Sequence, residues 1–332
     1  MQSDIKQIND LVAKEAVTVQ CLRNEIGKVI VGQEALVNRL LNALFNANHV
    51  LIEGVPGLAK TLTVTTLARA IAATFHRIQF TPDLLPADLL GTLIYNPKEG
   101  DFTTRKGPIF ANVILADEIN RAPAKVQSAL LESMQERQVT IGGQSYPLPE
   151  PFLVMATQNP VEQEGTYPLP EAQVDRFMFK LVVDYPSPAD ELRILRRASA
   201  SDANLTAEAA PVISPEDVAR IRRLANQVFM DAKVEEYIVS LVDCTRHPEK
   251  YRLDGLKGML RYGASPRATL FLAMGARVNA LMEGRGFTTP QDVKAVAGDV
   301  LRHRVMLTYE GEAEELTPDA VVAQVLDAVP VS

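Results

Sequence analysis

Residues 51–61 of this chain read Leu-Ile-Glu-Gly-Val-Pro-Gly-Leu-Ala-Lys-Thr, and this stretch decides the fold that we expect. An apolar run from His49 to Ile52 predicts a buried strand, a Gly- and Pro-rich turn follows it, and a helix is expected from Leu62 to Thr74. Strand, glycine turn, Lys-Thr and helix form the layout of a P-loop, in which backbone N–H groups and the helix amino end bind phosphate. The alternative for the same pattern is an ordinary strand–turn–helix.

The residues that close this stretch have the side chains that phosphate chemistry needs. Lys60 can reach the β- and γ-phosphates of a nucleotide, and the Thr61 hydroxyl can ligate Mg²⁺. The usual pattern has Gly where this chain has Ala59, and alanine is tolerated there if its φ stays negative, because only a positive φ strongly penalises a Cβ. The residues expected to contact the nucleotide here are Gly54, Val55, Pro56, Gly57, Leu58, Ala59, Lys60, Thr61 and Leu62.

A second motif lies in residues 112–118, which read Asn-Val-Ile-Leu-Ala-Asp-Glu. The apolar residues predict a buried strand, and a parallel sheet brings the last residues of its strands to the ligand edge. Asp117 would hold Mg²⁺ through water, and Glu118 would polarise the attacking water as general base. A strand that simply ends in exposed acids gives the same string, but its position after a P-loop favours catalysis.

A third strand is expected over residues 151–156, and Thr-Gln-Asn-Pro follows it. Asn159 would then lie at the same edge of the sheet, where its amide can orient the lytic water or sense the γ-phosphate. The alternative for Asn159 is a turn-forming Asn before Pro.

The rest of the first half fits an α/β domain with two hairpins. One hairpin is expected within residues 92–110, and a second within 138–149, around the pair Gly142-Gly143. The other elements predicted are helices over residues 4–27, 34–46 and 122–137, a short helical piece within 81–91, and strands over 77–80 and 178–183.

A linker at residues 184–188 precedes a second half that is predicted to contain only helices. Ser214, Ser265, Thr289 and Thr317 each precede a proline, which is the signal of an N-cap followed by the first helical residue. We therefore expect an α/β domain over residues 1–186 and a helical domain over 187–332.

Two arginines have unusual positions. Arg267 would lie in the first turn of a helix, where the helix dipole disfavours a cation, so a nearby phosphate or a compensating carboxylate is expected. Arg176 precedes a predicted strand, and on its own it indicates no more than a surface salt bridge.

The composition is that of a soluble globular protein, with 47% hydrophobic residues in 332. No apolar run is long enough for a membrane span, and Met1-Gln2-Ser3-Asp4 begins polar, without a signal-peptide core. Cys21 and Cys244 fit no metal spacing and indicate a reducing, cytoplasmic compartment. The net charge of −7 argues against a nucleic-acid binder.

Taken together and in order, these motifs resemble those of the AAA+ ATPases, and among them the MoxR family. The resemblance covers nearly the whole chain. The segments that carry it are Gly54–Thr61, Ala116–Pro123, Ala156–Pro160, Leu169–Phe177 and Ala264–Ala268.

The resemblance implies a three-layer α/β/α core with a parallel five-stranded sheet, followed by a C-terminal helical lid. Residues 92–110 would be the insert of the second helix region, and 138–149 the hairpin before the sensor strand. It also implies roles for single residues. Asn159 resembles sensor 1, Arg176 the arginine finger and Arg267 sensor 2, while Val31 and Gly32 resemble the adenine-side contacts.

Proteins similar to this one bind ATP and Mg²⁺ and act as chaperone-like ATPases that mature, or load cofactors into, client enzyme complexes. They commonly work with a von Willebrand A-domain partner and form hexameric rings. Three alternatives are a magnesium-chelatase-like motor subunit, a DNA-translocating motor and a nucleotide-binding scaffold without catalysis. DNA translocation is disfavoured because residues 138–175 contain no Lys or Arg, and the scaffold is disfavoured because Glu118 and Arg176 are both present.

Overall fold

A computed structural model describes residues 2–54, 59–98, 100–158, 165–199 and 208–331. The chain forms two compact units. The first, which we call the sheet unit, comprises residues 21–177 and 181–219, and the second, the helical unit, comprises residues 1–20, 178–180 and 220–332.

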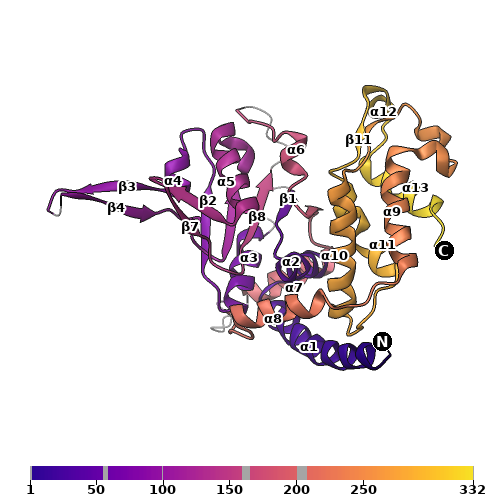
Figure 1. Cartoon of the computed structure of the whole chain (residues 1–332), viewed down its shortest axis with the longest axis horizontal. Coiled ribbons are helices and arrows are strands. Elements are labelled where there is room, and N and C mark those ends of the chain that lie inside the picture. Colours follow the sequence, from indigo (N-terminus) through magenta and orange to yellow (C-terminus); the bar gives the residue numbers. More distant parts are fainter. Residues whose placement is uncertain (1, 55–58, 99, 159–164, 200–207, 332) are drawn as a thin grey trace. The chain divides into compact units, whose positions relative to one another are not determined.

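A five-stranded sheet in the order β2-β5-β8-β1-β9 is the framework of the α/β fold (Figure 1). The strands are β1 (Val50–Glu53), β2 (Phe75–Gln79), β5 (Val113–Asp117), β8 (Leu153–Gln158) and β9 (Phe179–Val182). The pairs β2–β5, β5–β8 and β8–β1 are parallel. The amide of Val183 donates to the Glu53 carbonyl at 2.9 Å, so β9 ends beside the end of β1. The predicted five-stranded parallel sheet is confirmed.

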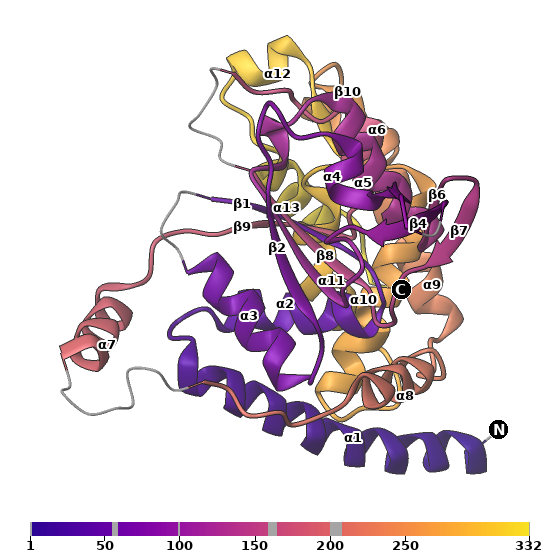
Figure 2. The same ribbon diagram turned by 90° about the vertical axis from the view of Figure 1, so that its left-hand side faces the viewer.

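Helices cover both faces of this sheet, because its inner strands are apolar on both sides. Figure 2 shows α2 (Glu34–Phe45) and α3 (Lys60–Ala70) on one side, and α4 (Pro86–Leu90) and α5 (Ala124–Glu136) on the other. Side chains alternate along a strand, so Ile114 and Ala116 face the α5 side, where they join a buried cluster with Leu130. The residues between them, and Asp117 at the end of β5, therefore face the α3 side.

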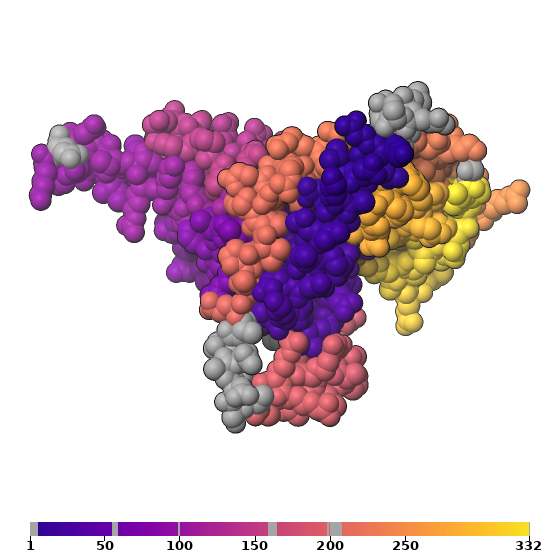
Figure 3. Space-filling view, turned by 90° about the horizontal axis from the view of Figure 1, so that it is seen from below, coloured from indigo at the N-terminus to yellow at the C-terminus, as the bar shows by residue number. Residues whose placement is uncertain are grey.

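Both predicted hairpins are present in the sheet unit. β3 (Gly91–Asn96) pairs with β4 (Asp101–Lys106), and β6 (Gln138–Ile141) pairs with β7 (Gln144–Pro147). Gly142 and Gly143 have φ values of 59° and 84°, as a tight two-residue hairpin turn requires. The β3–β4 hairpin projects from the body of the sheet unit, and the helix α7 (Pro188–Ser199) forms a second projection (Figure 3).

The remaining helices include α1 (Gln2–Val29), α6 (Glu171–Val174), α8 (Pro215–Ala225), α9 (Ala232–Arg246), α10 (Pro266–Met282), α11 (Pro290–Leu301), α12 (Tyr309–Ala313) and α13 (Pro318–Ala328). Four of them begin at the prolines that the sequence singled out, and the Ser265 and Thr317 hydroxyls accept hydrogen bonds from the first turns of α10 and α13. Throughout the ranges described above, no helix is both long and apolar enough to span a bilayer.

The expectation that only helices follow residue 187 is wrong. β10 (Leu260–Tyr262) and β11 (Met306–Leu307) form a small antiparallel pair in the helical unit. Each strand is too short to show a period of alternation in the sequence, which is why it was missed. The domain boundary expected after residue 186 stays a prediction; α7 and residues 208–219 group with the sheet unit.

Candidate active site at the carboxyl edge of the sheet

The predicted P-loop connects β1 to α3, as the sequence indicates. Val55, Pro56, Gly57 and Leu58 lie outside the described residues, whereas Gly54 and Ala59 on either side of them are described. A Cβ at Gly54 would come within 2.6 Å of the Val183 carbonyl oxygen, so the close approach of β9 also requires glycine here.

The condition of a negative φ at Ala59 is not met. Ala59 has φ 54° and ψ 23°, which is the left-handed conformation, and it serves as the N-cap residue of α3. Its carbonyl accepts the Thr63 amide at 2.9 Å, which is the first bond of the helix. The chain thus turns into α3 at a backbone conformation that costs an alanine roughly 1 kcal/mol relative to glycine.

Lys60 lies at the start of α3 with its ammonium group turned toward Gly54 at the end of β1. Its Nζ donates to the Gly54 carbonyl oxygen at 2.6 Å. Burial lowers the pKa of Lys60, and the nearby negative charges of Asp117, Glu118 and Glu53 oppose that change. The loop lysine and the two acids of the second motif therefore face one another across the carboxyl edge of the sheet, the edge at which β1, β5 and β8 end.

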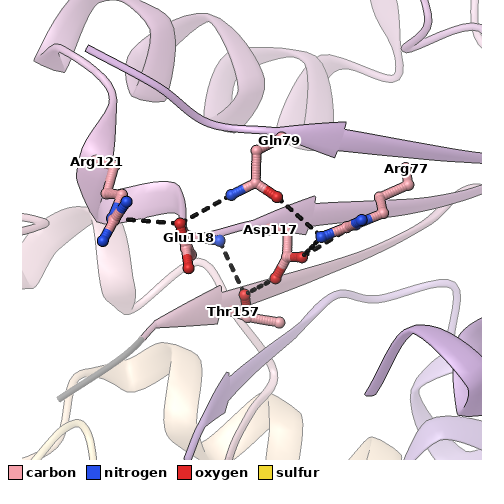
Figure 4. Close-up of polar contacts among 6 residues, drawn as sticks. All are labelled: Arg77, Gln79, Asp117, Glu118, Arg121 and Thr157. Carbon is pink, nitrogen blue, oxygen red and sulfur yellow. Dashed lines mark hydrogen bonds and ion pairs between the residues drawn. The ribbon is translucent and has the colours of Figure 1, made fainter. Parts of the chain in front are cut away.

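Asp117 ends β5 and is held from both neighbouring strands (Figure 4). Its Oδ1 accepts the Thr157 hydroxyl of β8 at 2.6 Å. Its Oδ2 accepts Nη2 and Nε of Arg77 on β2, at 2.6 and 3.1 Å. The parallel register pairs Gln79 with Asp117, so the side chains of Arg77, Gln79 and Asp117 lie on one face of the sheet.

Glu118 follows Asp117 in a left-handed conformation, with φ 57° and ψ 50°. Its amide donates to the Thr157 hydroxyl oxygen at 2.9 Å, so this one hydroxyl fixes both acids. The Glu118 carboxylate accepts Nε2 of Gln79 at 2.8 Å and lies 3.2 Å from Nε of Arg121. Left-handed backbone at a non-glycine residue is stored strain, and strain of this kind concentrates at functional sites.

Sequence reasoning missed four of the residues in this arrangement: Arg77, Gln79, Arg121 and Thr157. A signal for two of them was present. Arg77 and Gln79 alternate with Ile78 and Phe80 in the strand that the sequence predicts, and alternate side chains of a strand lie on one face of the sheet. Because β2 is an edge strand of the sheet, its polar residues become a signal only together with the acids that end β5 beside it.

The predicted adenine-side residues lie between α1 and α2. Gly32 has φ 72°, and a Cβ there would lie 2.5 Å from Cγ of Asp190 on α7. Asp190 is held by the Ser187 hydroxyl at 2.7 Å and by Arg193. The Arg197 guanidinium also donates to the Lys28 carbonyl at 2.9 Å, so α7 packs directly on the segment that contains Val31 and Gly32.

Among the predicted sensor and finger residues, Arg176 does not join this cluster. Asn159 lies outside the described residues. Arg176 precedes β9 and therefore lies toward the amino ends of the strands, beside a pocket of about 240 Å³ between α5 and α6 that Glu132 and Glu136 also line. Arg267 belongs to the helical unit, where its amide donates to the Ser265 hydroxyl in the first turn of α10.

Comparisons with known proteins agree with this geometry. Residues 49–179 match the model of the ATPase family associated with various cellular activities (AAA), and residues 256–325 match the AAA lid domain. Chaperone MoxR1 of Mycobacterium tuberculosis is 50% identical over 96% of this chain and 83% of its own length. The chain belongs to the MoxR family of AAA+ ATPases.

Two further similar proteins support the assignment. Protein MoxR of Methylorubrum extorquens is 34% identical over 92% of this chain and 93% of its own length. A solved structure from Cytophaga hutchinsonii, described as a candidate ATPase, is 49% identical and superposes with a TM-score of 0.91 over 98% of both chains.

The residues at the carboxyl edge fit a nucleotide-bound magnesium ion. Mg²⁺ prefers oxygen ligands and keeps several waters, and the Thr61 hydroxyl and the Asp117 carboxylate are ligands of this kind. Asp117 Oδ2 accepts a hydrogen bond from the Arg77 guanidinium, so this carboxylate already binds a positively charged group. The side chains of Thr61 and Asp117 are both only partly buried.

Proposed function

We propose that this chain hydrolyses ATP in a Mg²⁺-dependent reaction at the carboxyl edge of the sheet. The observation that carries the proposal is the position of Glu118. Its backbone is in the strained left-handed conformation, the Thr157 hydroxyl bonds both its amide and the Asp117 carboxylate, and its charge lies close to that of Lys60. Bound magnesium would neutralise phosphate charge. Lys60 would bind the β- and γ-phosphates, Thr61 and (through water) Asp117 would hold the metal, and Glu118 would take the proton of the attacking water.

The other predicted residues have supporting roles in this proposal. Val31 and Gly32 would contact the adenine, and the P-loop backbone would bind the phosphates together with Leu62. Asn159 would position the water, and Arg176 and Arg267 would meet the γ-phosphate, Arg176 from a neighbouring subunit.

The test separates binding from hydrolysis. We expect Lys60→Ala to lose binding of a fluorescent ATP analogue, and Glu118→Gln to bind it normally while phosphate release falls at least about 10²-fold. Lys125→Ala on the exposed face of α5 and Glu235→Gln on α9 are matched controls, and both should behave as the parent protein. Near-normal turnover of Glu118→Gln would exclude Glu118 as the base.

The position of Arg176 supports a ring, which we expect to be hexameric. A cation beside the amino end of β9 is far along the sheet from Asp117 at the carboxyl edge, so a neighbouring subunit is needed to bring the two together. Trans arginines can contribute about 10³–10⁵ in rate. Mixing Arg176→Ala and Lys60→Ala proteins should restore ATPase activity, because mixed rings pair an intact loop with an intact arginine. No recovery after verified subunit exchange would contradict a trans role.

The work done by hydrolysis is proposed from the relatives. MoxR1 of M. tuberculosis is named a chaperone, so we propose chaperone-like remodelling, maturation or cofactor loading of a client complex, with a von Willebrand A-domain partner. Free Cys21 and Cys244 suit a reducing, cytoplasmic setting. Pull-down with Glu118→Gln in ATP should capture the client, whereas capture of a chelatase complex would favour the magnesium-chelatase alternative.

We further propose that the chain does not act on nucleic acid. The β6–β7 hairpin has no basic residue, and the net charge is −7. Binding to DNA at about 10⁻⁸ M, which is typical of specific DNA binders, would reverse this proposal. DNA stimulation of the ATPase would do the same.

A further inference from the structure

Gln127 of α5 is fully buried, and its amide bonds three backbone positions of the sheet unit. Its Nε2 donates to the carbonyl oxygens of Tyr167 at 2.9 Å, Ala122 at 3.1 Å and Ile119 at 3.2 Å. Because carbonyl oxygens only accept, the NH₂ end of the amide faces them, and its two hydrogens are shared among three acceptors. One side chain therefore holds both the turn that follows Glu118 and a segment 40 residues beyond Gln127.

The turn that Gln127 holds is the short 3-10 helix η1 (Ile119–Arg121), which begins at Glu118. The Glu118 carbonyl accepts the Arg121 amide at 2.9 Å, so the left-handed backbone of Glu118 opens a hydrogen-bonded turn. Gln127 bonds the first carbonyl of η1 and the carbonyl that follows η1. The direction in which the Glu118 carboxylate points therefore depends on Gln127.

The segment that Gln127 holds is the one that leads to Arg176. The Tyr167 amide donates to the Asn120 carbonyl oxygen at 2.6 Å, while the Tyr167 carbonyl accepts Gln127, so this residue is fastened to η1 at both of its backbone groups. Further along, three apolar residues of the segment join the buried cluster that contains the apolar face of α5. They are Leu169, Val174 and Phe177.

The next residue of α5 extends this support to the neighbourhood of Arg176. The Ser128 hydroxyl oxygen lies 3.5 Å from Nε2 of Gln173 in α6, which is a packing contact rather than a strong hydrogen bond. Ser128, Gln173 and Arg176 line the same pocket between α5 and α6. Adjacent residues of one helix thus support the turn that contains the base and the short helix that precedes Arg176.

We propose that Gln127 is a positioning residue for both halves of the ATPase site. One half is Glu118 of the same chain, and the other is Arg176, which serves the site of a neighbouring subunit. The inference rests on the proposed function, in which the two halves meet across a subunit boundary. Because Gln127 fastens the segment before Arg176 to the turn after Glu118, neither can shift without the other.

The expected consequence is a loss of turnover without a loss of nucleotide binding, since Gln127 bonds backbone beyond β5 and not the P-loop. Gln127→Met keeps the length of the side chain and removes its two donor hydrogens. Phosphate release should fall at least about tenfold, because a shift of about 1 Å in a catalytic group can cost about 10²-fold. The affinity for a fluorescent ATP analogue should change by less than about twofold, which separates kcat from binding.

Two further variants calibrate this result. Gln127→Glu should turn over more slowly than Gln127→Met, since it places a carboxylate oxygen against three carbonyl oxygens. Gln324→Met, on the exposed side of α13, makes the same chemical change and is the matched control. It should turn over as the parent protein does.

Mixed rings test the two halves separately. In a mixture with Arg176→Ala, which keeps an intact base, activity returns only if Gln127→Met presents a working arginine. In a mixture with Lys60→Ala, which keeps an intact arginine, activity returns only if Gln127→Met presents a working base. After verified subunit exchange, we expect neither mixture to exceed the activity of Gln127→Met alone.

A second variant breaks the same link outside the core, and it decides the question if Gln127→Met does not fold. Tyr167 is 45% exposed, and Tyr167→Pro removes the amide hydrogen that the Asn120 carbonyl accepts. We expect Tyr167→Pro to bind the ATP analogue as the parent does, to lose turnover, and to give the same result in both mixtures.

Each contrary outcome has a separate meaning. If the parent protein does not hydrolyse ATP, the proposed function is wrong. If the parent hydrolyses ATP and both Gln127→Met and Tyr167→Pro do so at a similar rate, the inference fails and the proposed function stands. Recovery in one mixture would assign Gln127 to one half only and contradict the link. An equal fall in turnover and in ATP affinity would indicate general loosening and contradict a positioning role.

Discussion

The Thr157 hydroxyl is the contact on which the candidate site depends most, and Thr157→Val removes it with little change of shape. Thr157 is 2% exposed, so water cannot replace the lost partner. The Glu118 amide loses its acceptor at 2.9 Å, and Asp117 loses a charge-assisted donor at 2.6 Å. A neutral bond is worth about 0.5–1.5 kcal/mol and a charge-assisted one about 1.5–3. We therefore expect the site to lose about 2–4 kcal/mol of local stability.

Hydrogen exchange measures this local loss directly. In the peptide that contains Glu118, exchange should accelerate about 30-fold to 10³-fold, since protection follows the free energy of local opening and about 1.4 kcal/mol is a factor of ten. Turnover should fall about 10²-fold, because a shift of about 1 Å in a catalytic group costs that much. Thr157→Ser keeps the hydroxyl and is the matched control. Equal exchange of this peptide in Thr157→Val and Thr157→Ser would refute the reasoning.

Two further predictions concern the sheet unit away from the acids. Burial holds the pKa of the His49 imidazole at about 3, and its Nδ1 accepts a hydrogen bond from the Val154 amide, which protonation of this nitrogen would break. The urea concentration at the midpoint of unfolding should therefore fall as the pH drops from 6.5 toward 4, and it should fall less in His49→Gln. Gly32→Ala should lower both the melting temperature and the affinity for an ADP analogue. Adding Asp190→Ala should restore part of each loss, because it removes the clash between the new Cβ and the Asp190 side chain but leaves the positive φ of residue 32. If neither the melting temperature nor the affinity recovers, the packing argument is contradicted.

Most of the sheet could be predicted from the sequence because its signals are local. The strand that ends at Asp117 is a short apolar run followed by acids, and Gly142-Gly143 marks a two-residue turn. The Ser-Pro and Thr-Pro pairs mark helix starts, since a hydroxyl cap and a proline suit adjacent positions. In each case a few neighbouring residues determine the conformation.

The partners of the predicted residues could not be read in the same way. The sequence indicates Asp117 and Glu118, but their partners Arg77 and Thr157 lie about 40 residues away in either direction and meet them only through strand register. Ala59 is a second case. Its backbone is left-handed, and alanine has no intrinsic preference for that conformation.

The strand order explains why the type of such a partner can be predicted, a polar residue near the end of a flanking strand, although the particular residue cannot. β5 lies between β2 and β8, so any residue at its carboxyl end has one neighbour from each strand. To contact Asp117, the side chains of those neighbours must lie on the α3 side of the sheet, as the Asp117 side chain does. Side chains on that side occur at every second position of a strand. A polar residue at such a position on an inner strand has few other reasons to be there. Thr157 on the inner strand β8 meets that criterion, Gln79 lies on the edge strand β2, and each bonds Glu118. A search restricted to alternate positions near strand ends would therefore have found the residues that hold the two acids.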